Sequence, residues 1–211
     1  MATRAAAHIR YRNSRQIVVP GVTTILNLLA KPQLIIWANR LGLEGIDSTK
    51  YRDDKGDIGS AAHRMILAHI KGDKPDLESF TPEQVNKAEN CFLSYLEWAK
   101  GKEIAPVLVE APLVSEAHQF GGTLDFYGMV DGTLTLCDYK TGGIFSEAYY
   151  QLCAYHQLLV ENGQEAPKRG IILGIPRAET EAFQEPTYGD FERGWQIFFH
   201  LLQVYHLRKG A

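Results

Sequence analysis

Residues 122–142 decide the fold of this chain, and they read Gly122-Thr-Leu-Asp125-Phe-Tyr-Gly-Met-Val-Asp-Gly132-Thr-Leu-Thr-Leu-Cys-Asp138-Tyr-Lys140-Thr-Gly142. Apolar and polar residues alternate on both sides of the pair Asp131-Gly132, which is the pattern of two strands joined by a tight hairpin. Both residues of that pair tolerate the positive φ of a two-residue type I′ turn. The stretch therefore predicts antiparallel strands over 122–130 and 133–139.

The turn also sets the register of the two strands. A loop of only two residues places Asp125 directly opposite Asp138, with Cβ atoms about 5 Å apart. Lys140 lies two residues beyond Asp138 and so points to the same side of the strand. Two carboxylates and one ammonium group are therefore expected on one patch. A bulge at the turn would shift Asp125 out of this register.

Two neighbouring carboxylates repel each other, and one tends to take up a proton unless a cation neutralises the pair. Hard oxygen ligands of this kind suit Mg²⁺ or Mn²⁺. An alternative interpretation is that Asp138 and Lys140 form an ordinary exposed pair on a sheet edge, with Asp125 as a neighbour. For an isolated Asp-x-Lys, this alternative is the more common outcome.

The following helix favours a functional site. After a Thr-Gly-Gly loop, a helical run is expected from about Ser146 to Asn162. Its Glu147, Gln151 and Tyr155 recur at intervals of four residues, which places them on one face. A polar stripe of this kind beside a carboxylate cluster needs a functional reason.

These three linked motifs, G-T-L-D, D-Y-K-T-G and Q-x-x-x-Y, resemble the PD-(D/E)XK nuclease superfamily in its RecB-like nuclease branch. The order and spacing match over about Phe120 to Tyr155. Upstream, Gly59-Ser-Ala-Ala-His63 is similar to the helix that carries a metal-binding histidine in that branch. The opening, residues 20–37, is similar to phage-type and mitochondrial genome maintenance exonuclease-like members. The resemblance implies an α/β fold with a restriction-endonuclease-like core, a small mixed sheet flanked by helices, and N-terminal helical additions.

The resemblance also implies roles for the motif residues. Asp125 and Asp138 would be metal ligands, together with the backbone carbonyl of Tyr139. His63 would complete the metal shell, although a lone histidine on a helix is more often a packing or capping residue. Lys140 would orient or activate the attacking water and stabilise charge on the phosphate.

Further members of the expected site surround this centre. Gln151 and Tyr155 would position the lysine, the substrate or its phosphates, and Thr141 would be a further substrate contact. Glu110 matches an acidic residue that many members carry before the Asp-bearing strand, where it would bind a second metal or its water. Glu116 lies nearby, and the loop between these two glutamates cannot be counted into a register.

The function implied is a Mg²⁺- or Mn²⁺-dependent deoxyribonuclease, with an exonuclease in DNA replication, recombination or repair favoured and a phage origin expected. DNA, single- or double-stranded and bound at its ends, would be the substrate. A non-catalytic nucleic-acid-binding or scaffold protein and a structure-specific endonuclease are the alternatives. The presence of every motif residue favours the enzyme. A homo-oligomer and a replication or recombination partner protein remain open.

Composition bounds the remaining expectations. The chain has 211 residues, 45% of them hydrophobic, which suits one domain over 17–211 with a sizeable core. No apolar run reaches the ~18 residues that a membrane span needs and the N-terminus lacks an apolar leader, so a soluble protein that is not secreted is expected. The odd number of cysteines suits a reducing cytoplasm, and the resemblance implies that of a bacterial or phage-infected cell. Only three cysteines occur, widely separated, whereas related nucleases with an iron-sulfur cluster use four, so no cluster is expected. The net charge of −3 argues against a strongly basic DNA-binding coat.

Two segments outside the motifs carry expectations of their own. Residues 1–16 form a basic arm, in which Arg4, Arg10, Arg12 and Arg15 surround Tyr11. This arm would either contact phosphates or be a solvated tail. Residues 47–56 are polar without periodicity and are expected to form a loop over the site, before a helix that begins near Ile58. On that helix His69 does not share the face of His63.

Overall fold

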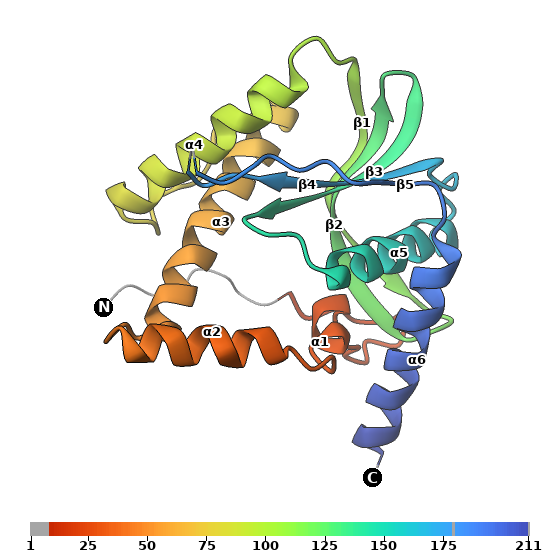
Figure 1. The fold of residues 1–211 in the computed structure, drawn as a ribbon. Helices are drawn as coiled ribbons and strands as arrows, with labels where there is room; N and C mark the ends of the chain where they lie inside the picture. The colour runs from red at the N-terminus through yellow and green to blue at the C-terminus, as the bar shows by residue number, and fades with distance from the viewer. Residues whose placement is uncertain (1–8, 179, 211) are drawn as a thin grey trace.

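The computed structural model describes residues 9–178 and 180–210, and Figure 1 shows their arrangement. In chain order the elements are α1 (Val22–Leu26), α2 (Pro32–Leu43), α3 (Ser48–Lys71), α4 (Pro82–Ala99), β1 (Ile104–Ser115), β2 (Phe120–Val130), β3 (Thr133–Thr141), α5 (Ser146–Glu161), β4 (Arg169–Ile175), β5 (Thr187–Tyr188) and α6 (Glu192–Lys209). Among these described helices, none is long and apolar enough to cross a membrane.

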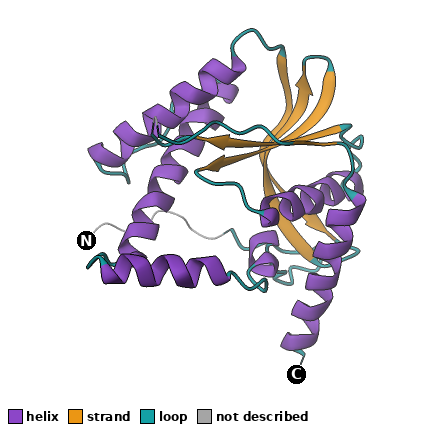
Figure 2. Ribbon diagram, in the orientation of Figure 1, coloured by secondary structure: helices purple, strands orange, loops and turns teal. Residues whose placement is uncertain are grey.

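The strands form one mixed sheet in the order β1-β2-β3-β4-β5. β3 and β4 are parallel, with α5 connecting them, and the other neighbouring pairs are antiparallel. Two buried clusters lie on opposite faces of the sheet, one beneath α1, α5 and α6 and the other beneath α3 and α4. Figure 2 shows the same layering, with helices on both sides of the strands. The predicted class, a small mixed sheet flanked by helices with helical additions before it, is confirmed.

The predicted hairpin is present. Asp131 and Gly132 have φ values of 50° and 72°, so both occupy the left-handed region that a type I′ turn requires. The register runs from Val130 opposite Thr133 to Phe126 opposite Cys137. A bulge at the turn is therefore excluded.

The register agrees with the prediction, but the hydrogen-bonded ladder between β2 and β3 stops one pair before Asp125 and Asp138. The ladder ends at Phe126 and Cys137, and the side chain of Asp125 takes over the next hydrogen bond. Its Oδ2 accepts the backbone N–H of Tyr139 at 2.8 Å. A carboxylate thus replaces a backbone carbonyl at the point where the two strands separate.

The expected loop over residues 47–56 is also wrong, since these residues belong to α3 apart from Asp47. The carboxylate of Asp47 caps the helix by accepting the backbone N–H groups of Thr49 and Lys50 at 2.9 and 3.1 Å. The first turns of α3 face solvent, and its buried residues begin only at Ile58. Because an exposed helical turn needs no apolar stripe, periodicity placed the helix start ten residues late.

The described part of the basic arm, residues 9–16, packs against the start of β2. The hydroxyl of Tyr11 lies 3.0 Å from Thr123 Oγ1, and its ring covers Gly121, where a Cβ would lie only 2.5 Å from Tyr11 atoms. Asn13 is buried and donates to the side chain of Gln119 at 2.6 Å. Arg10, Arg12 and Arg15 are exposed along this segment, whereas Arg4 lies outside the described residues.

Candidate active site

Asp138 lies inside the protein, with only 1% of its surface exposed. It follows Leu134 and Leu136 on the face of β3 that packs under α5. Lys140 Nζ lies 2.6 Å from Asp138 Oδ2 as an ion pair. The alternative of an exposed pair on a sheet edge is therefore wrong for Asp138, because β3 is an interior strand and this carboxylate is buried.

Burial sets the charge balance of Asp138. Loss of hydration raises its pKa from 3.8 to about 6, the neighbouring carboxylate of Asp125 adds to the rise, and the ammonium of Lys140 opposes it. Among the described residues no group makes an aligned hydrogen bond with the buried Oδ2, although Lys140 is close enough for an ion pair. A buried carboxylate oxygen with unused acceptor capacity is costly for stability and is typical of a functional site.

The stripe on α5 meets Lys140 as predicted for two of its three members. Lys140 Nζ donates to Gln151 Oε1 at 3.0 Å, and Gln151 Nε2 donates to the hydroxyl oxygen of Tyr155 at 2.6 Å. Tyr155 is buried, and its ring lies so close to Gly122 that a Cβ there would be 2.6 Å from Tyr155 Cε1. The ammonium is thus held in place by a chain of side chains. Glu147 takes no part in this chain and pairs with Lys31 at 3.4 Å.

α3 approaches the same strand from the opposite face of the sheet. His63 Nε2 lies 2.6 Å from the carbonyl oxygen of Tyr139, and His63 Nδ1 lies 3.7 Å from Asp125 Oδ1. One turn earlier, a Cβ on Gly59 would lie 2.6 Å from Thr141 Oγ1, so glycine permits the close approach of the helix. Thr141 therefore contacts α3 beside the site.

The groups expected to bind metal are thus brought together. They are the carboxylates of Asp125 and Asp138, the carbonyl of Tyr139 and the imidazole of His63. In residues 9–178 and 180–210, no three His, Cys, Asp or Glu side chains are already arranged to hold an ion. Two of the candidate ligands, His63 and the Tyr139 carbonyl, contact each other instead, and Asp138 is paired with Lys140. The oxygen-rich donor set fits Mg²⁺ or Mn²⁺, and Asp138 Oδ2, which has an ion pair with Lys140 but no aligned hydrogen bond, could take part in it.

Neither glutamate considered for a second metal has a free carboxylate. Glu110 is half exposed and binds Lys71 Nζ at 2.9 Å, with a left-handed backbone at φ 52°. Glu116 accepts both the backbone N–H and the hydroxyl of Ser14, at 2.6 and 3.0 Å. Glu116 therefore anchors the N-terminal segment, while Glu110 would have to leave Lys71 before it could bind an ion.

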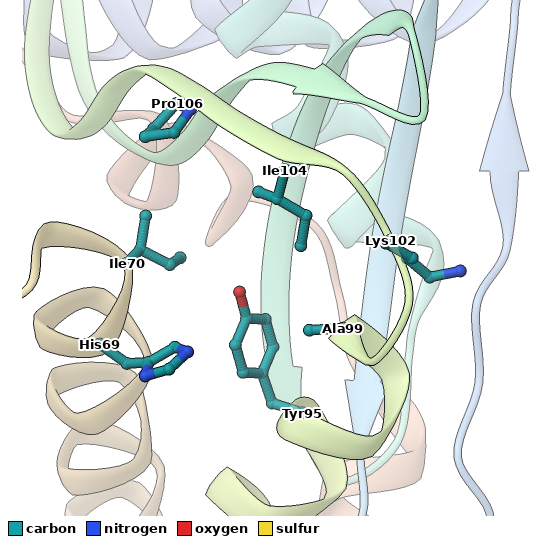
Figure 3. A pocket seen from close by; sticks show the side chains of 7 residues that line it. All are labelled: His69, Ile70, Tyr95, Ala99, Lys102, Ile104 and Pro106. Atoms are coloured by element: carbon teal, nitrogen blue, oxygen red, sulfur yellow. The ribbon is translucent and has the colours of Figure 1, made fainter.

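A separate hollow of about 280 Å³ lies between α3, α4 and β1, and Figure 3 shows its lining side chains. His69 lines this hollow, in keeping with the expectation that it does not share the face of His63. Tyr95, also in its wall, touches the buried ring of Tyr139 with the ring centroids 5.7 Å apart. The contact between Tyr95 and Tyr139 thus connects the wall of the hollow to the site.

One residue near the site has no counterpart in the sequence motifs. Arg177 follows β4, whose last residue, Ile175, pairs with Thr141 of β3. Its guanidinium group rests against Gly142, two residues after Lys140. The only sequence signal for Arg177 is its place just beyond a buried strand. The parallel pairing of that strand with β3, which brings Arg177 to the site, could not be predicted from residue spacing.

No protein-family model and no curated protein matches this chain. Among solved structures, it is similar to a protein from Eubacterium rectale that carries a provisional exonuclease description, with 12% identity and a TM-score of 0.49. That similarity covers 72% of this chain and 65% of the other, so this chain spans about two thirds of that protein's length. It is also similar to LHK-Exo, an alkaline exonuclease from Laribacter hongkongensis, with 13% identity and a TM-score of 0.34 over 74% of this chain and 90% of that one. Similarities this weak establish no activity for this chain.

Proposed function

We propose that this protein is a metal-dependent deoxyribonuclease of the PD-(D/E)XK superfamily, in the RecB-like branch, and that it hydrolyses phosphodiester bonds as an exonuclease. One observation carries the proposal. A buried carboxylate, Asp138, is paired with a lysine that Gln151 holds from α5, and the charges of Asp125 and His63 are near enough to act on its pKa. An ion pair with only a structural role would not need Asp125 from β2, His63 from α3 and Gln151 from α5 around it.

The side chains of this site divide the work of phosphodiester hydrolysis. Asp125, Asp138, the Tyr139 carbonyl and His63 would hold Mg²⁺ or Mn²⁺, which supplies polarisation of the phosphodiester and acidification of a water molecule. Lys140 places a fixed positive charge where negative charge develops on the phosphate. Because Gln151 already orients the ammonium group, little reorganisation is needed when the substrate arrives.

Tyr155 acts on the lysine through Gln151. Its hydroxyl oxygen accepts one of the two amide hydrogens of Gln151, so the carbonyl oxygen of that amide faces Lys140. Burial raises the pKa of Tyr155 well above its usual value, so the phenol stays protonated and neutral. We assign Tyr155 a positioning role rather than contact with the reacting atoms.

The decisive experiment incubates the pure protein with end-labelled linear DNA and with circular DNA, each single- and double-stranded, in Mg²⁺, Mn²⁺ or EDTA. Loss of linear DNA while circles survive, in the presence of a divalent ion only, is the expected result. Lys140→Ala should abolish cleavage, whereas Lys100→Ala, which removes an exposed lysine on the far end of α4, should retain it.

Three outcomes would contradict the proposal in whole or in part. Intact substrates in every condition would point to a nucleic-acid-binding or scaffold protein that keeps the fold. Full cleavage by Lys140→Ala would show that the activity lies elsewhere. Cleavage of circles would identify an endonuclease working with the same chemistry.

A further inference from the structure

The chain segments that leave β3 and β4 lie next to each other beside Lys140. The two strands are parallel, and their last paired residues are Thr141 and Ile175. The loop after β3 begins with Gly142-Gly143, and the loop after β4 begins with Pro176-Arg177. Loops at the carboxyl ends of parallel strands are a common place for ligand binding. The two loops therefore lie where a substrate that reaches Lys140 would continue.

Arg177 has a fixed position in this region. Its Nη2 lies 2.9 Å from Glu181 Oε1, and its backbone N–H donates to Glu181 Oε2 at 2.8 Å. On its other side the guanidinium group touches Gly142, where a Cβ would lie 2.6 Å from Nη2. Gly142 also has a φ of 91°, so the turn needs glycine both for its backbone and for the space that Arg177 fills.

An aromatic ring lies on the other side of the same turn. Phe145 is 67% exposed, which is unusual for a phenylalanine. Its ring rests 3.7 Å from the position that a Cβ of Gly143 would take. Beside the same turn lies a hollow of about 190 Å³, lined by Gly142, Gly143, Glu181, Ala182 and Gln184. The turn is thus flanked by a cation and by an exposed aromatic face.

We propose that Arg177 and Phe145 form a nucleotide subsite next to the scissile phosphate, in which Arg177 binds the flanking phosphate and Phe145 stacks on its base. This inference rests on the proposed nuclease function and adds to it a contact for the substrate. The guanidinium fork matches phosphate oxygens, which would take the place of Glu181. Stacking on an aromatic ring accepts any base, so the subsite would carry little sequence preference.

Binding in EDTA tests the subsite without cleavage. Fluorescence anisotropy would compare short labelled oligodeoxynucleotides in which one phosphate is replaced by a neutral methylphosphonate, or one base is removed, at successive positions. Arg177→Gln should weaken binding of unmodified DNA about fivefold, and Phe145→Ala by a similar or larger factor. At one position, the methylphosphonate should weaken binding by the wild-type protein and not by Arg177→Gln. Removing the base beside that phosphate should likewise weaken binding by the wild-type protein and not by Phe145→Ala.

Glu181→Gln should bind about threefold more tightly, because phosphate no longer competes with a carboxylate for Arg177. Arg208→Gln and Leu207→Ala remove an exposed arginine and an exposed apolar residue from the end of α6 and serve as matched controls. The subsite is refuted if Arg177→Gln and Phe145→Ala bind like these controls, or if the modified linkages weaken every variant equally. Binding with these patterns but without cleavage in Mn²⁺ would instead refute the nuclease function and leave the subsite standing.

Discussion

Replacing Asp138 by asparagine should raise the stability of the metal-free protein, relative to the wild type, as the pH increases. The wild-type carboxylate is buried, and its pKa in the folded protein is raised from 3.8 to about 6, chiefly by loss of hydration. A carboxyl group with a raised pKa favours the folded state while it is protonated. Its contribution is fully present below pH 3.8 and is lost as the pH rises through 6.

The size of the effect follows from the same pKa. When Asp138 is ionised in both the folded and the unfolded protein, the rise of its pKa from 3.8 to about 6 lowers the unfolding free energy by about 3 kcal/mol, since one pKa unit corresponds to about 1.4 kcal/mol. The asparagine variant carries no such charge, so its stability lacks this pH dependence. Between pH 4.5 and pH 8, the unfolding free energy of Asp138→Asn should rise by about 2 kcal/mol relative to the wild type.

Urea unfolding in EDTA measures this difference at several pH values. The change of the difference with pH isolates the ionisation of Asp138, because the cost of placing an amide in the site is the same at every pH. Glu97→Gln, which neutralises an exposed carboxylate on α4, serves as the control and should show a much smaller change.

Parallel stability profiles for the wild type and Asp138→Asn would refute the reasoning, because they would mean that burial does not raise the pKa of Asp138. A difference that grows towards low pH would show that Lys140 outweighs burial and holds this pKa below its usual value. Either result would show that the ionised carboxylate of Asp138 does not lower the stability of the folded protein.

Three further predictions concern the supports of the site. Gly59→Ala should lower stability by about 1–3 kcal/mol in urea unfolding, and adding Thr141→Ala should restore most of the loss, because a new Cβ would lie 2.6 Å from Thr141 Oγ1; no recovery would mean that another contact is responsible. Gln151→Leu should lower kcat on DNA by at least about tenfold with little change in KM, since Lys140 loses the acceptor that orients it, and an unchanged kcat would remove Gln151 from the mechanism. Gly132→Ala should cost about 1 kcal/mol through its φ of 72° alone, as a Cβ there meets open space, and its DNA cleavage should be unaffected.

Much of the site could be predicted from short-range patterns. The pair Asp131-Gly132 determines the turn type, the turn determines the register, and strand periodicity then places Asp138 and Lys140 on one face. Helical spacing likewise puts Gln151 and Tyr155 on one side of α5. These inferences succeed because each depends on backbone geometry over a few residues.

Contacts between distant segments decided the rest. Asp125 leaves the ladder because its own carboxylate binds Tyr139, and Glu110 is paired with Lys71, which precedes it by 39 residues. No periodicity in either strand encodes these contacts, since each depends on where another element comes to lie.

The sequence by itself determined the hairpin and the shared face of Asp138 and Lys140, because turn chemistry and side-chain alternation are local. The mixed α/β class and the place of Gln151 beside Lys140 were expected from the resemblance of the motifs to a nuclease superfamily. Only the tertiary structure decided that Asp138 is buried and that Arg177 and Phe145 flank the turn after Lys140. Burial and the parallel pairing of β3 with β4 arise when helices cover both faces of the sheet. That packing is a property of the whole chain, which no single stretch specifies.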